Sequence, residues 1–163
     1  MSSLALNALP STLQSVRTRP LFAMQLKVNM LEVGEAPGGH RRIGVVTGGT
    51  FHGERLAGEV LDGGSDWLTV RPDGVTTLDV RLVMKTTDGA MIGMTYRGLR
   101  HGPADVMQKL NRGEAVDPAD YYFRIAPLLE TAAKTYDWLN RVVCVGVGHR
   151  PPGGPVYSVF EVL

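Results

Sequence analysis

Between Thr47 and Arg100 short apolar runs alternate with glycine-containing turns, and this alternation constrains the fold more than any other feature of the chain. The turns read Gly-Gly, Pro-Asp-Gly and Thr-Asp-Gly. They supply the residues that reach the positive φ angles of hairpin turns. Each apolar run is shorter than a stable helix requires. The pattern therefore predicts a meander of antiparallel strands that curls into a barrel.

Similar runs flank this segment on both sides. The predicted strands cover residues 21–33, 41–49, 54–61, 65–71, 76–86, 90–100, 121–132, 137–150 and 155–163. Pro127 is expected to break the strand over residues 121–132. One short amphipathic helix is predicted over residues 102–113, where Pro103 suits the first turn and Gly113 ends the helix. The fold class is thus all-β, an antiparallel up-and-down barrel of the lipocalin or streptavidin type with about nine strands and one short helix.

The first 20 residues are rich in Ser, Leu and Thr without a clean period, and we interpret them as a flexible leader. Residues 21–163 then form a single barrel domain. The N-terminal segment has neither a basic leader nor a long apolar run, which predicts a cytoplasmic protein with no membrane partner. The net charge of +1 lacks the positive excess that a nucleic-acid partner requires.

Cofactor and metal signals are weak throughout. The four histidines lie beside glycines or in turns, at none of the spacings of a ready metal site, so no metal is predicted. The runs TGGTFHG and VGVGHR lack the remaining elements of a phosphate loop, and no cofactor is predicted. The single Cys144 lies in an apolar run and is interpreted as a buried, inert thiol.

The predicted strand over residues 76–86 has two contrasting faces. One carries apolar and the other mainly charged side chains: Leu78, Val80, Leu82 and Met84 against Asp79, Arg81, Val83 and Lys85. The pattern alone favours an apolar interior, because charged side chains are rarely fully buried. In the alternative, Asp79 and Arg81 pair inside an apolar wall and bind a polar ligand. The outer apolar face would then be covered by the leader or another subunit.

Several polar side chains are candidates for chemistry. The guanidinium of Arg124 could hold a carboxylate or an enolate, although a structural ion pair with Glu130 or Asp79 fits the pattern as well. Tyr96 could donate a proton, and Glu59 or Asp79 could accept one, if they converge in a pocket. Each tryptophan, Trp67 and Trp138, is interpreted as a core anchor in preference to a stacking platform, and Asn140 could reach the lumen.

Several longer stretches of the chain resemble the proteins grouped as domain of unknown function 3237. They are GGTFHGERLAGEVLDGGSDWLTVRPDG, LDVRLVMKTTDGAMI, GLRHGP, YYFRIAPLLETA and YDWLNRVVCVGVGHR. The resemblance implies an antiparallel barrel without an established family-wide activity. It also implies an inward polar cluster, at positions that correspond here to Asp66, Trp67, Arg71, Asp79, Arg81, Arg97, Arg124, Glu130, Thr131, Trp138 and Asn140. Leu68 and Tyr96 depart from the family pattern and make such a pocket more apolar.

Three functions are consistent with these patterns. In the first, the barrel binds a small, partly apolar metabolite with an anionic or carbonyl group, through Trp67, Arg71, Arg81, Arg97, Glu130, Trp138 and Asn140. In the second, a cofactor-free isomerase, lyase or hydrolase uses Arg124 for an oxyanion, Asp79 or Glu59 as base and Tyr96 as acid. In the third, strand edges near Phe160 and Val162 pair between copies in a homodimer or a higher homo-oligomer.

Overall fold

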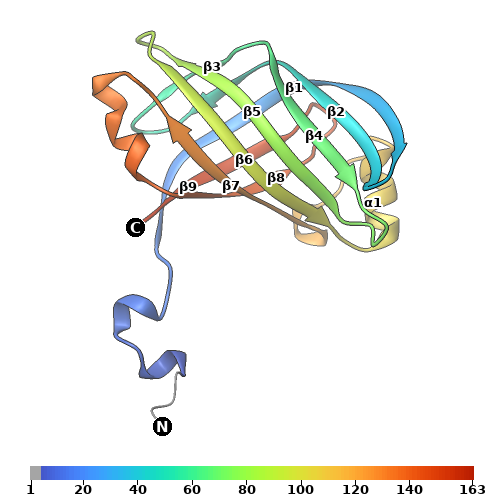
Figure 1. The fold of residues 1–163 in the computed structure, drawn as a ribbon, viewed down its shortest axis with the longest axis horizontal. Coiled ribbons are helices and arrows are strands. Elements are labelled where there is room, and N and C mark those ends of the chain that lie inside the picture. Colours follow the sequence, from blue (N-terminus) through green and yellow to red (C-terminus); the bar gives the residue numbers. More distant parts are fainter. Residues whose placement is uncertain (1–4) are drawn as a thin grey trace.

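A closed antiparallel barrel forms the body of the computed structural model, which describes residues 5–163 (Figure 1). Its nine strands are β1 (Thr18–Ala36), β2 (Gly39–His52), β3 (Ala57–Val60), β4 (Gly64–Val70), β5 (Thr76–Thr86), β6 (Met91–His101), β7 (Tyr122–Glu130), β8 (Cys144–His149) and β9 (Val156–Val162). The described helical segments are α1 (Ala104–Asn111) and the 3₁₀ helices η1 (Leu6–Ala8), η2 (Ser11–Leu13), η3 (Pro118–Asp120) and η4 (Lys134–Arg141).

The strand order confirms the predicted up-and-down topology. Each strand from β4 to β9 pairs with the next along the chain, and β9 pairs with β1 to close the ring. The short strands β3 and β4 occupy one position in the barrel, because both pair with β2 on one side and β5 on the other. Closure of the ring gives every one of these strands a partner on both sides, and the shortest contact is that of β7 with β8.

The strand predicted over residues 137–150 is wrong in its first half. Residues Lys134–Arg141 form the 3₁₀ helix η4, and strand β8 begins only at Cys144. The side chain of Asn140 fixes this turn, since it accepts a hydrogen bond from the Thr131 backbone N–H (2.8 Å) and donates one to the Thr131 carbonyl (2.9 Å). A polar side chain that forms hydrogen bonds with nearby backbone groups competes with strand pairing. The alternation of apolar and polar residues does not predict such a contact.

Strand β7 continues through Pro127, where the sequence predicted a break. Pro127 pairs with Tyr96 of β6, and inward and outward side chains keep alternating up to Glu130. On its other side β7 pairs with β8 only at Arg124 and Ile125. The missing N–H of proline therefore falls where no ladder partner is present, which is where a strand tolerates it.

The N-terminal segment runs away from the barrel (Figure 1). Strand β1 begins at Thr18, slightly before the predicted boundary, because Thr18 already pairs with Val162 of β9. The residues before it form η1 and η2 and stay almost entirely exposed. We name residues 5–17 the arm; its predicted flexibility stays a prediction, and residues 1–4 lie outside the described part.

The two ends of the barrel are closed differently. At one end η4 packs its fully buried Leu139 against the core. The nearby Glu161 carboxylate pairs with Arg19 (2.9 Å) and with Arg55, whose guanidinium stacks 4.1 Å from the Trp138 ring centroid. At the other end lies α1, the helix predicted over 102–113 (Figure 1). None of the described helices combines the length and apolar character needed to cross a membrane.

Candidate functional site

The inner wall of the barrel is lined mainly by apolar side chains. On β5 the residues Leu78, Val80, Leu82 and Met84 are buried, while Asp79 and Arg81 point outward. The apolar interior that the pattern alone favours is therefore confirmed. The alternative, in which Asp79 and Arg81 face the inside of the barrel, is wrong. The physical reason is desolvation, because burying the three ionic groups Asp79, Arg81 and Lys85 and exposing the apolar side chains of the same strand would both cost free energy.

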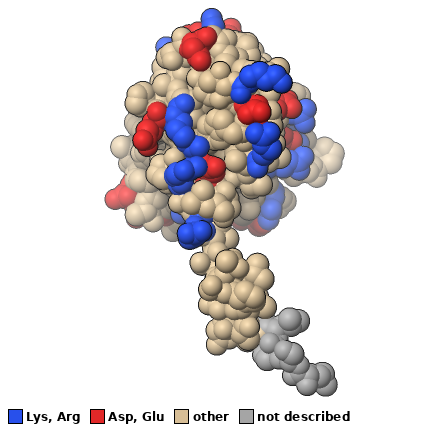
Figure 2. Space-filling model, turned by 90° about the vertical axis from the view of Figure 1, so that its left-hand side faces the viewer, with Lys and Arg blue, Asp and Glu red and all other residues tan. Residues whose placement is uncertain are grey.

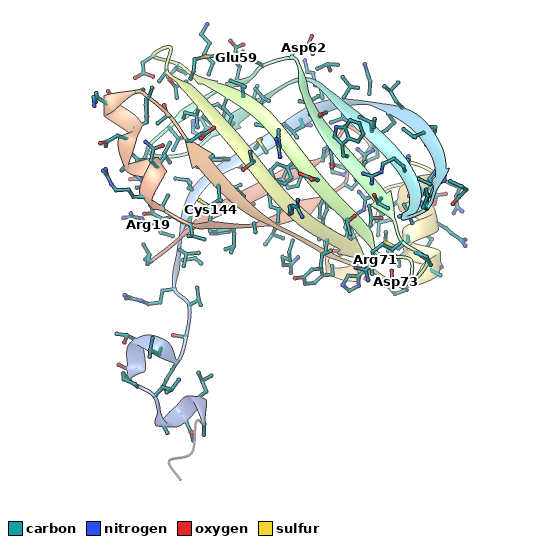
Figure 3. All side chains as sticks on the ribbon, viewed as in Figure 1. Arg19, Glu59, Asp62, Arg71, Asp73 and Cys144 are labelled. Atoms are coloured by element: carbon teal, nitrogen blue, oxygen red, sulfur yellow. The ribbon has the colours of Figure 1, made fainter. Side chains whose placement is uncertain are left out.

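Most other predicted site residues also lie outside the lumen. Glu59 is exposed on the outside of the barrel, and Arg71 pairs with Asp73 in the turn before β5 (Figure 3). Near η4, Glu130 is exposed, Asn140 is bonded to Thr131 as described, and Trp138 is half-buried under Arg55. The prediction that the Asn140 side chain reaches the lumen is wrong. Four further candidates share an outer groove: Trp67, Asp79, Arg97 and Arg124. Of the proposed acid and base groups, only Tyr96 faces the interior.

The α1 end of the barrel contains an internal cavity. Its volume is about 60 Å³, which is enough for a few water-sized groups. Leu26, Val80 and Phe123 contribute apolar wall, and Leu110 of α1 covers the end. Gly44 keeps the space open, since a Cβ there would lie 2.9 Å from Val28 and 3.6 Å from the Cβ of Asp66.

Arg100 is the most distinctive polar group of this cavity. It lies on β6 with the same parity as Tyr96, and only 8% of its surface is exposed. Its guanidinium lies over the Phe123 ring, 5.4 Å from the centroid. Its Nε is buried. Among the buried side-chain nitrogen and oxygen atoms of the described residues, it is the one without a hydrogen-bond partner. An unpaired buried donor is costly, and the cost is recovered when a ligand supplies the acceptor.

Asp66 on β4 supplies the negative charge of the cavity. Burial raises the pKa of its carboxyl to about 7, although a hydrogen bond from the Asp79 backbone N–H (3.2 Å) and the charges of Arg100 and Arg150 act in the opposite direction. Among the described ion pairs Asp66 has no partner within 4.0 Å. A carboxyl that titrates near neutral pH in an enclosed space is suited to proton transfer.

Two tyrosines complete the polar lining. The rings of Tyr96 on β6 and Tyr157 on β9 meet edge to face, with centroids 5.6 Å apart. Burial raises the pKa of both phenols, and that of Tyr96 rises well above its usual value. Both side chains therefore stay protonated at neutral pH and can donate hydrogen bonds to a ligand.

Two further arginines line the cavity. Arg42 of β2 is held by Glu32, whose carboxylate accepts a hydrogen bond from Arg42 Nε (2.9 Å). Arg150 follows β8, and its backbone N–H donates to the Tyr121 hydroxyl (2.8 Å), which also lies 2.9 Å from His149 Nδ1. With Arg100 the lining thus carries three guanidinium groups against the single carboxyl of Asp66. This balance favours an anionic or strongly polarised ligand.

Sequence reasoning did not find Arg100, Arg42, Arg150 or Tyr157, and it reached Asp66 only through the family resemblance. The available signal was the alternation of side chains along β6. Arg100 lies an even number of residues after the buried Met94 and therefore on the same, otherwise apolar, inward face. Other chemistry is not evident in the described part. There no three His, Cys, Asp or Glu side chains gather as metal ligands, and Cys144 is buried, which raises its thiol pKa to about 11.

Comparison with known proteins establishes the family. The family model described as "Protein of unknown function (DUF3237)" matches residues 16–162. The chain belongs to the DUF3237 family. Within it, a UPF0311 protein of Rhodopseudomonas palustris is 35% identical over 150 residues, covering 91% of this chain and 98% of the relative. A UPF0311 protein of Bradyrhizobium diazoefficiens is 34% identical and covers 90% and 96%.

Solved structures support the DUF3237 barrel. The crystal structure of a conserved protein of unknown function from Rhodopseudomonas palustris matches with a TM-score of 0.88 and 35% identity, covering 91% of this chain and 99% of the other. A structure described as a β-barrel-like protein from Acinetobacter baumannii gives 0.78 and 37%, covering 91% and 97%. A more distant structure, described as an enzyme from Penicillium herquei, gives 0.68 and 21%, covering 91% and 95%, and shows a shared fold.

Proposed function

We propose that this protein binds a small, partly apolar molecule with a carboxylate or carbonyl group inside the α1 end of the barrel. The buried, unpartnered Nε of Arg100 carries this proposal, because it is a fixed donor that lacks an acceptor. The guanidiniums of Arg42 and Arg150 add positive potential, and the leucine and valine walls accommodate a short apolar group. The small volume of the cavity favours a short bound group.

Propionate and propionamide test this proposal, because they are similar in size and differ in charge. Propionate at a hundredfold excess over its dissociation constant is expected to stabilise the protein by about 2.7 kcal/mol, or roughly 5–10 °C in Tm. Propionamide is expected to shift Tm much less, since it lacks the charge that pairs with the three arginines. Thermal unfolding and titration calorimetry measure both. Equal responses, or none to either compound, would contradict the proposal.

A second candidate function is proton transfer next to a carbonyl group. It is favoured by Asp66, whose carboxyl has a pKa of about 7 in the same cavity as two protonated tyrosines. In this step the Asp66 carboxylate takes a proton from the carbon beside the carbonyl, and the C–H electron pair forms the enolate. Hydrogen bonds from Arg100 and Tyr96 stabilise the enolate oxygen, and return of the proton to the opposite face of that carbon, or to a carbon conjugated with it, completes an isomerisation without a cofactor.

Exchange of the pyruvate methyl hydrogens in D₂O tests the second candidate. Wild-type protein is expected to accelerate the loss of the methyl proton signal above the buffer rate, and Asp66→Asn is expected to lower this acceleration by at least about a hundredfold. Glu59→Gln, a carboxyl-to-amide change at an exposed residue on the outer face, serves as the matched control and is expected to retain the wild-type rate. The same exchange rate for wild type and Asp66→Asn would eliminate Asp66 as the base.

A further inference from the structure

The outer face of the barrel has a groove that is separate from the internal cavity. Arg41 of β2 and side chains from β4 to β9 line it, and its volume of about 880 Å³ is open to solvent. Its large apolar side chains are strongly exposed, with 50% of Trp67 and 42% of Leu99 accessible, and Val145 and Val147 extend the surface across β8. Contiguous exposed apolar surface of this kind marks a site of contact with another molecule.

The charges of the groove restrict what can occupy it. Its charged lining residues are Arg41, Arg97, Arg124 and Asp79. Asp79 is engaged with Arg97 at 3.6 Å, and the Arg124 guanidinium lies 4.9 Å from the Tyr122 ring centroid. Two grooves brought face to face would place six arginines together with only two aspartates, which is repulsive. The favoured occupant is therefore apolar, carries no positive charge and offers hydrogen-bond acceptors to the arginines.

The part of the arm before Arg17 has these properties. Residues 5–16 contain no charged side chain, and Figure 2 shows this segment as an uncharged projection beyond a barrel surface of mixed charge. Its apolar side chains have little protein to contact, with 61% of Leu13 accessible. Its local shape is supported internally, because Gln14 Nε2 donates to the Leu9 carbonyl (2.8 Å). Its other backbone carbonyls can accept hydrogen bonds from arginines.

The base of the arm directs it away from its own barrel. The Leu163 backbone N–H donates to the Arg17 carbonyl (2.9 Å), and Arg19 pairs with Glu161 of β9 at 2.9 Å. These contacts fix the departure of the chain at the strand end, and the arm continues outward from there (Figure 1). A segment so anchored reaches a neighbouring molecule without rearrangement of the barrel.

We propose that residues 5–16 of one copy dock into the outer groove of a second copy. In this arrangement Leu13 and its apolar neighbours cover Trp67 and Leu99, and the groove arginines donate hydrogen bonds to carbonyls of the arm. A single contact thereby removes the exposed apolar side chains of the arm and those of the groove from water. Reciprocal exchange between two copies closes a symmetric dimer, whereas one-way docking continues as a chain of copies. The proposal is independent of ligand binding inside the barrel.

Light scattering on the full-length protein gives the first test. The wild type is expected to have a mass at least twice the 17.6 kDa of one chain. Leu13→Asp in the arm and Leu99→Asp in the groove are each expected to raise the dissociation constant at least about tenfold, because each places a carboxylate in an apolar contact. Val83→Asp is the matched control, since Val83 is 40% exposed on β5 outside the groove. A monomeric wild type, or association that Leu13→Asp leaves unchanged, overturns the proposal.

Disulfide trapping gives a second test that does not depend on affinity. Leu13→Cys protein is mixed with Ala126→Cys protein, whose new thiol lies in the groove lining, and the mixture is oxidised. The native Cys144 is buried and does not compete. A mixed disulfide dimer is expected for this pair and not for Leu13→Cys with Val83→Cys. Equal crosslinking of both pairs would overturn the assignment of the groove as the docking site.

Discussion

Arg100→Met is expected to weaken propionate binding at least about tenfold, corresponding to about 1.5 kcal/mol or more, while the barrel remains folded. The loss follows from removing the one buried side-chain donor without a partner among residues 5–163. Titration calorimetry on wild type and variant measures the difference. The unfolding temperature is expected to stay equal or to rise, because burial lowers the pKa of Arg100, which indicates a charged group held at a cost in desolvation.

Arg97→Met is the control for this prediction. Arg97 lies on the same strand, but its side chain points outward and is 84% exposed. Its replacement is expected to leave propionate affinity unchanged. Arg100→Lys is informative as well, because it retains the charge and loses the planar set of donors, and intermediate affinity is expected. Unchanged affinity in Arg100→Met would refute the assignment of this cavity as the binding site.

Asp66→Asn is expected to stabilise the folded protein at pH 8 by about 1–3 kcal/mol. The folded-state pKa of Asp66 is about 7, well above the usual value of 3.8. At a pH between 3.8 and about 7 the Asp66 carboxyl is ionised in the unfolded chain and protonated in the folded protein. The stability of the wild type therefore falls as the pH rises through this range, and it levels off above pH 7. A shift of this size sets a ceiling of about 4 kcal/mol, and local relaxation lowers the measured effect.

The asparagine keeps the hydrogen bond from the Asp79 backbone N–H, because its side-chain oxygen accepts in the same way. Denaturant unfolding of wild type and variant at pH 5, 6, 7 and 8 measures the effect, and the difference between them isolates Asp66 from other titrating groups. Glu59→Gln, at an exposed residue on the outer face, is expected to track the wild type. If wild type and Asp66→Asn keep a constant difference across this range, Asp66 does not titrate as proposed.

The two predictions together describe a site that is maintained at the expense of stability. Arg100 and Asp66 are each expected to lower the stability of the folded protein when no ligand is bound, since one leaves a donor unsatisfied and the other resists ionisation. Groups of this kind persist where a ligand or a reaction uses them, and their removal tends to increase stability while function is lost.

Much of the barrel was predictable because strand signals are local. Turn glycines and alternating side chains located the strands, and the apolar parity of β5 indicated which side faces the interior. Local signals failed where a side chain satisfied the backbone, as Asn140 does at η4. They failed again at Pro127, which strand β7 accommodates because β8 does not pair with β7 at that position.

By itself the sequence determined the strands, their order and the family, since hairpin turns make neighbours in sequence neighbours in space. The tertiary structure alone decided which polar groups meet. Asp66, Arg100 and Tyr157 lie on β4, β6 and β9, and they share one cavity only because β9 closes the ring against β1. Closure also placed Asp79 and Arg124 outside, because the interior of a small barrel holds few charges and the pleat assigns every other residue to solvent.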